Sequence, residues 1–121
     1  MDLEFKQSGV DIVILEEALS SGGEVTNDVR KYIEELINNL ERYREFVASK
    51  MLGLYNETWY DESIGTLSKQ EFVAKLINPS INIYDDAGYA LVYFGDSNVF
   101  GGHYIEVGVQ NGAAEDASLA G

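Results

Sequence analysis

The sequence predicts an α+β fold, in which an antiparallel sheet of about five strands packs on one long amphipathic helix and one short helix. Apolar side chains recur every three or four positions from residue 29 to 51, as in an amphipathic helix. From Ser80 the pattern instead changes to period two, because Ile81 and Ile83 alternate with Asn82 and Tyr84, as in a half-buried strand. With a β-branched run near the N-terminus, the predicted order is β-β-α-α-β-β-β.

The first two strands are expected at residues 3–7 and 10–15. The second reads Val-Asp-Ile-Val-Ile-Leu, and β-branched residues favour extended backbone. Gly9 lies between the two segments, where a glycine can form a tight turn or a bulge. Residues 20–23, Ser-Ser-Gly-Gly, are expected to form a loop.

The long helix has the clearest pattern in the chain. Its apolar stripe consists of Val29, Tyr32, Ile33, Leu36, Ile37, Leu40, Tyr43, Val47 and Met51. The opposite face is charged, which indicates a helix side in contact with water. Thr26, Asn27 and Asp28 precede the stripe, and their side chains can cap the helix N-terminus.

A second, short helix is predicted to begin after Ser68. Ser68 and Glu71 have the spacing of a capping box, in which each side chain accepts a hydrogen bond from the other residue's backbone N–H. Its apolar face consists of Phe72, Val73, Leu76 and Ile77, and Asn78-Pro79 is expected to end it.

Three strands are predicted in the second half of the chain, at 81–84, 89–94 and 103–109. Asp85-Asp86-Ala87-Gly88 has the composition of a hairpin turn between the first two. In the last strand either Tyr104 or Ile105 points inward, depending on register. If that strand lies at the edge of the sheet, it could pair with a second copy of the chain and form a homo-oligomer.

The chain length of 121 residues fits one domain. Residues 1–110 are expected to form this α+β domain. Residues 111–121 are small, polar and poorly patterned, so they are expected to form a flexible C-terminal tail.

Acidity is the main functional signal. The chain has 21 acidic and 8 basic side chains, a net charge of −13, and no Lys or Arg follows Lys75. Such a surface repels nucleic acid and anionic membranes and attracts basic proteins. No apolar run is long enough to span a membrane, and the acidic N-terminus lacks signal-peptide features, so we expect a cytoplasmic protein. Without cysteine, thiolate chemistry and Cys-based metal sites are excluded.

The candidate binding residues lie in three segments that carry carboxylates, two of which also carry an aromatic or histidine side chain. They are Glu57, Trp59, Asp61 and Glu62, then Asp85 and Asp86, and finally Asp96, Phe100 and His103. A partner would contact the carboxylates first, and Trp59 or Phe100 would be its apolar anchor. The structural alternatives are solvated loop charges, turn formation, core packing for Trp59 and a backbone contact for His103. Neither carboxylate cluster has the spacing of a calcium loop, so no metal or cofactor is expected.

Four short segments carry a resemblance to a known group of proteins. They are Leu54–Trp59, Ser68–Leu76, Ser80–Asp86 and Phe100–Val107. Together they resemble a family of small bacterial domains of unknown function, over about residues 50–109. Some relatives of that group resemble immunity proteins of polymorphic toxin systems. The resemblance implies an α+β fold and no known catalytic residues.

The leading hypothesis is therefore a non-enzymatic, acidic binding protein, as in an immunity-type inhibitor of a basic, nuclease-like toxin. The alternative is a regulatory or housekeeping protein whose acidity serves solubility. A small metal-dependent hydrolase that uses His103 and nearby carboxylates is the third hypothesis.

Overall fold

The computed structural model describes residues 1–59, 62, 65–85, 88–95, 100 and 102–120. The strands are β1 (Leu3–Gln7), β2 (Val10–Ile14), β3 (Ile77–Ile83), β4 (Tyr89–Gly95), β5 (Tyr104–Gln110) and β6 (Ala113–Ala120). The helices are α1 (Asn27–Asn38), α2 (Leu40–Leu54) and α3 (Lys69–Ala74), with the short helical segments η1 (Glu16–Ala18) and η2 (Tyr55–Trp59). The fold is thus α+β, as predicted, with six strands in one sheet instead of about five.

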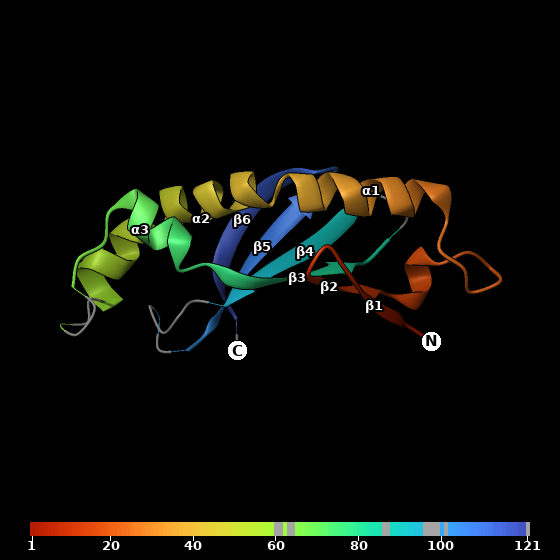
Figure 1. Cartoon of the computed structure of the whole chain (residues 1–121), viewed down its shortest axis with the longest axis horizontal. Helices are drawn as coiled ribbons and strands as arrows, with labels where there is room; N and C mark the ends of the chain where they lie inside the picture. The colour runs from red at the N-terminus through yellow and green to blue at the C-terminus, as the bar shows by residue number, and fades with distance from the viewer. Residues whose placement is uncertain (60–61, 63–64, 86–87, 96–99, 101, 121) are drawn as a thin grey trace.

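The strands lie in the sheet in the order in which they occur in the chain, and α1 and α2 lie end to end along one face (Figure 1). All neighbouring strands are antiparallel except β2 and β3, which are parallel, with Ile12 opposite Ile81. The prediction of a fully antiparallel sheet is wrong at this pair. The chain between β2 and β3 passes over the sheet as helices, and a crossover of this kind allows a strand to return in the same direction.

The predicted single long helix is two helices that meet at Asn39, where the backbone leaves helical geometry with φ −103° and ψ 8°. Asn38 and Asn39 are poor residues for a helix interior, because their side chains compete for backbone hydrogen bonds. The apolar stripe nevertheless continues across the break. Leu36 and Leu40 are both buried against the sheet, as predicted.

The short helix has the predicted capping box, with both reciprocal hydrogen bonds between Ser68 and Glu71. It ends at Ala74, earlier than predicted, and Ile77 already belongs to β3. Asn78 has a φ of +52°, and the pairing with β4 shifts between Ile77 and Ser80. Pro79 therefore lies at a bulge, one of the few places where a strand accepts a proline.

The predicted flexible tail is wrong for residues 113–120, which form the edge strand β6. This strand pairs with β5 along its length, with a bulge where Glu115 is inserted between the partners of Gly108 and Val109. Ala114, Ala117 and Leu119 pack against the core. Alanine and serine favour strands weakly, but the turn before this strand has a local signal. Asn111 and Gly112, with φ of +52° and +83°, form the two-residue turn between β5 and β6, and Asn-Gly is the dipeptide that such hairpins favour.

Two tyrosines tie the helices to turns at one end of the sheet. The Tyr43 hydroxyl donates to the Gly112 carbonyl at 2.8 Å, and the Tyr32 hydroxyl donates to the Gly88 carbonyl at 3.1 Å. The Gly112 N–H donates in turn to the Tyr32 hydroxyl at 3.3 Å. These bonds satisfy polar groups that would otherwise be buried at a cost.

Tyr43 is expected to make the fold sensitive to alkali. Burial raises its pKa to about 12, above the value of about 10 in an unfolded chain. Its contribution is therefore complete below about pH 10 and is lost as the pH rises from about 10 to 12, by an amount on the order of 2 kcal/mol. Urea unfolding across this range should show the loss. Tyr43→Phe should reduce it, leaving a remainder from Tyr32, whose pKa burial also raises. Tyr104→Phe is the control, and an equal effect of both substitutions would contradict the assignment.

Candidate functional site

The structure divides the predicted binding residues between two ends of the sheet. Within the β4–β5 pair, Tyr89 lies opposite Gln110 and Phe94 lies opposite Ile105. The turn that contains Asp85 is therefore at one end of β4, and the segment with Phe100 is at the other. A strand of seven residues is roughly 20 Å long, so the two groups do not form one contact surface.

The first and third predicted groups lie at the same end. Glu57 and Glu62 are exposed, and His103 is half-buried just before β5. The ring of Phe100 packs 6.0 Å from that of Tyr55, the residue that begins η2, which brings the two segments together. Among the predicted residues, Asp61, Asp86, Asp96 and the side chain of Trp59 lie outside the described part of the structure.

Phe100 is not the exposed anchor that was predicted. None of its surface is accessible, and its ring packs edge-on against Tyr55 and Phe72. In this conformation it belongs to the core and cannot contact a partner. Asp85 acts as a turn former, because its Oδ1 accepts the N–H groups of Gly88 and Tyr89 at 2.6 and 2.8 Å.

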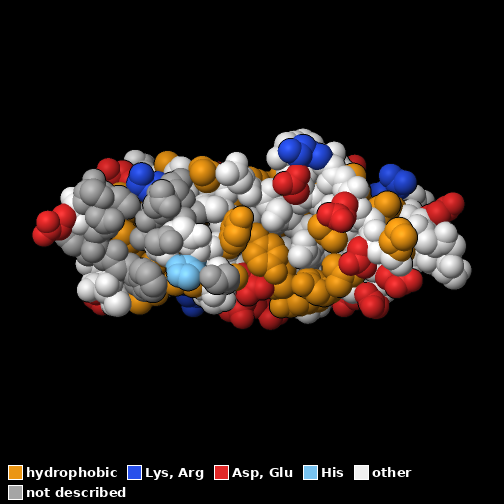
Figure 2. All heavy atoms as spheres, turned by 90° about the horizontal axis from the view of Figure 1, so that it is seen from below, with side chains coloured by type: hydrophobic (Ala, Val, Ile, Leu, Met, Phe, Trp, Pro, Cys, Tyr) orange, Lys and Arg blue, Asp and Glu red, His pale blue; other side chains and the backbone are white. Residues whose placement is uncertain are grey.

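The side of the sheet that faces away from α1 and α2 was not predicted as a site. We call it the open face. Strand register places one row of side chains across it, from Asp11 through Ser80, Tyr93 and Glu106 to Ser118. Hydrophobic side chains gather over the middle of this face, and carboxylates lie around them (Figure 2).

Four tyrosine side chains lie on the open face. They are Tyr84, Tyr89, Tyr93 and Tyr104. The rings of Tyr84 and Tyr89 lie 5.9 Å apart, and Tyr104 is 59% exposed. The Tyr93 hydroxyl donates to Oε1 of Glu106 at 3.1 Å. A tyrosine offers a partner both an apolar ring and a polar hydroxyl, which suits a surface used for recognition.

The electrostatics of the open face are acidic. Lys6 is the one Lys or Arg in the six strands, and its ammonium group lies 3.5 Å from the Asp11 carboxylate. Burial, together with the hydrogen bond and charge of Glu106, raises the pKa of Tyr93 far above its usual value. Burial and the charges of Asp116 and Glu106 also raise the pKa of Tyr89. Both hydroxyls are protonated at neutral pH, as in an ordinary tyrosine, and the raised pKa values extend this state to higher pH.

The sequence feature that could have pointed to the open face is the alternation of side chains between the two sides of β4. Tyr89, Leu91 and Tyr93 occupy one side of the strand, and the residues between them occupy the other. Both sets contain large apolar side chains. The pattern alone therefore does not say which side the helices cover.

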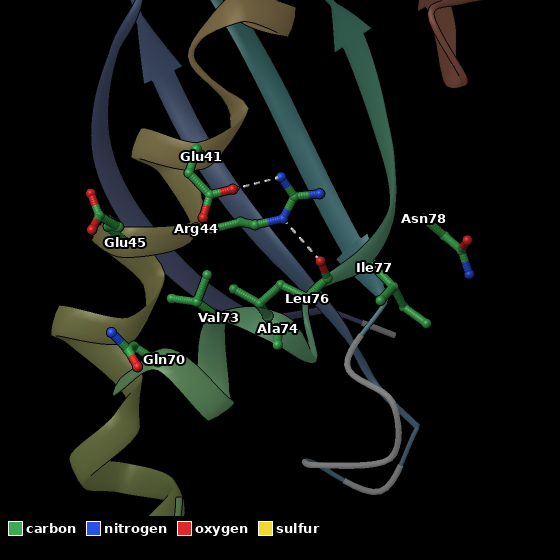
Figure 3. Close-up of a pocket in the computed structure, with 9 residues that line it drawn as sticks. All are labelled: Glu41, Arg44, Glu45, Gln70, Val73, Ala74, Leu76, Ile77 and Asn78. Atoms are coloured by element: carbon green, nitrogen blue, oxygen red, sulfur yellow. Dashed lines mark hydrogen bonds and ion pairs between the residues drawn. The ribbon is translucent and has the colours of Figure 1, made fainter. Parts of the chain in front are cut away.

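A groove of about 610 Å³ lies between α2, α3 and the beginning of β3 (Figure 3). Arg44 reaches across it, and its Nε donates to the Leu76 carbonyl at 3.0 Å. Nη1 lies 3.4 Å from Oε2 of Glu41, and the guanidinium is 5.0 Å from the centre of the Phe94 ring. Arg44 thus joins α2 to the sheet. Among the described residues that line the groove there is no Ser, Thr, Cys or His, and the ionisable groups there are Glu41, Arg44 and Glu45.

Residues 2–119 match a family described as an uncharacterized protein conserved in bacteria, DUF2262. The chain belongs to this family. The match confirms the predicted resemblance to a bacterial family of unknown function and extends it from about residues 50–109 to nearly the whole chain. No curated protein and no solved structure matches the sequence.

Two further properties of this DUF2262 chain concern the part that the structure describes. Within it, no three His, Asp or Glu side chains lie close enough together to hold a metal ion. None of the helices described is both long and apolar enough to cross a membrane.

Proposed function

We propose that this DUF2262 protein acts by binding, and that its open face recognises a basic protein in the bacterial cytoplasm. An immunity-type inhibitor of a nuclease-like toxin is the specific form of this function that we propose. The observation that carries the proposal is the open face itself. Four tyrosines share it with carboxylates, and its one lysine is already paired with Asp11.

The tyrosines support a binding role because Tyr is enriched among the residues that dominate binding energy in protein interfaces. Tyr104 extends into solvent, whereas Tyr93 is held in place by its hydrogen bond to Glu106. A face that is already ordered loses little conformational entropy when a partner binds.

The carboxylates support the choice of partner. A nuclease site is built to hold phosphates and is therefore positively charged, and an acidic face is complementary to it. Opposite potentials increase the association rate, and salt reduces this effect because it shortens the reach of charge to about 8 Å at physiological ionic strength. We expect the direct contacts to come from the open face. Glu57 and Glu62 at one end of the molecule and Asp85 at the other should add to the negative electrostatic potential that attracts the partner.

The test is capture of a partner from native lysate at low and high salt, followed by binding kinetics with the captured protein. Asp11→Asn should slow association roughly two- to fivefold at low salt, because it removes charge from the open face. Tyr104→Ala should mainly speed dissociation, by roughly tenfold or more, because it removes an exposed ring.

Glu34→Gln is the matched control, since it removes the same charge from the exposed side of α1, in the helical layer. It should change the association rate less than Asp11→Asn does. Equal effects of the two charge variants, or an affinity that does not depend on salt, would leave the acidity as a means of solubility.

A further inference from the structure

A second cavity lies on the helical side of the sheet, between β1 and the start of α1. Its volume is about 310 Å³, and it is lined by Leu3, Phe5, Gln7, Val25, Arg30 and Ile33. Phe5 pairs with Ile12, whose side chain is buried beneath the helices, so both point to the same side of the sheet. We call this cavity the β1–α1 pocket. It is separate from the open face.

The pocket has an apolar floor with a solvent-accessible rim. Ile33 is buried at its base, and Phe5 and Val25 are half-buried. Leu3 has 37% of its surface exposed. Its volume is at the lower end of the range of roughly 300–1,000 Å³ that small-molecule sites occupy. A short apolar group bound there would remove part of this lining from water, which is favourable.

Arg30 is the charged residue of the pocket, and Gln7 is the other polar residue in its lining. The chain has 21 acidic side chains, yet none of the ion pairs or side-chain hydrogen bonds found among the described residues involves Arg30. Lys6 pairs with Asp11 and Arg44 with Glu41, whereas Lys31, Arg42 and Lys69 make no such contact among the described residues either. Arg30 differs from these three because it lines the pocket. The guanidinium of Arg30 therefore keeps its planar set of donors available, and this geometry matches a carboxylate.

We propose that the β1–α1 pocket binds a small amphipathic carboxylate, with its apolar tail on Phe5 and Ile33 and its carboxylate on Arg30. The combination of an apolar cavity with one unpaired cation selects this class of ligand. A cationic ligand with the same tail is repelled by the charge of Arg30, and a carboxylate without a tail cannot use the cavity.

Octanoate, below its micelle concentration, is the probe, and octylammonium and acetate are the comparison ligands. Titrations followed by amide chemical shifts should show octanoate perturbing the backbone near Phe5, Val25 and Ile33. Octylammonium should bind at least about tenfold more weakly, and acetate should not perturb these amides. Arg30→Gln should weaken octanoate binding about tenfold and remove the preference over octylammonium.

Lys31→Gln is the matched control, because it removes the same charge from the next residue of α1, which does not line this pocket. It should leave octanoate binding within about twofold of the original. Octylammonium binding as tightly as octanoate, equal effects of Arg30→Gln and Lys31→Gln, or perturbed amides elsewhere would overturn the proposal. None of these outcomes bears on the open face.

Discussion

Replacing Phe100 by Ala is expected to lower the free energy of unfolding by about 3–5 kcal/mol. The ring is fully buried and contacts Tyr55 and Phe72 edge-on, with ring centres 6.0 and 6.1 Å away. Its removal takes away both its transfer free energy and these aromatic contacts, and it leaves a cavity between η2, α3 and the segment before β5. Urea unfolding followed by circular dichroism measures the effect.

Tyr104→Ala is the control, because it removes an aromatic ring only four positions away that is largely exposed. Its expected effect on stability is within about 0.5 kcal/mol. A Phe100→Ala variant as stable as the unsubstituted chain would mean that the ring lies at the surface, which was the expectation from sequence.

Ending the chain after Gln110 is expected to lower the free energy of unfolding by about 5 kcal/mol or more. A loss of this size is comparable to the total stability of many single domains, so most of the truncated protein should be unfolded. The truncation removes β6, whose Leu119 packs on the core, and leaves β5 as an edge with buried apolar residues uncovered. It also deletes Gly112, so the buried Tyr43 hydroxyl loses its acceptor at a cost of about 1–3 kcal/mol. Loss of cooperative thermal unfolding is the expected readout.

Ser118→Ala is the control, because it tests whether stability depends on β6 as a strand or on its individual polar side chains. Ser118 is exposed on β6, and its substitution should change stability by no more than about 0.5 kcal/mol. If residues 111–121 were a flexible tail, the truncated chain would keep the stability of the complete one.

The helices show where local pattern is sufficient for prediction. A stripe such as Leu36, Leu40 and Tyr43 can be buried on one side only if the backbone is helical, and all three are buried. The capping box at Ser68 is equally local, since all its atoms lie within four residues. The break at Asn39 was not predicted, because the apolar stripe has the same phase on both sides of it.

The sheet shows where local pattern is insufficient. Strand alternation identified β4 and β5, and the inward side of β5 proved to be Ile105. The direction of β3 relative to β2 depends on the path of about 60 intervening residues. The pattern within a short stretch of sequence carries no information about that path. β6 is a strand because β5 offers it an unpaired edge and α2 covers it, although its own residues favour strands weakly.

The features of the candidate functional sites also divide into those that the sequence predicts and those that depend on tertiary contacts. Acidity and the lack of basic residues after Lys75 are properties of composition, and the prediction of a basic partner rests on them independently of the fold. The burial of Phe100 and the assembly of Tyr93 with Glu106 depend on contacts between separate elements.

By itself, the sequence determined the α+β class, the helical stripe, five of the strands and the sign of the surface charge, because these follow from composition or from spacing within a few residues. Only the tertiary structure decided the parallel pair, the packing of the sixth strand against α2, the face on which the tyrosines are displayed and the pocket that Arg30 lines. Each of these depends on which segments distant in the chain become neighbours, and that choice is made by the burial of the whole core.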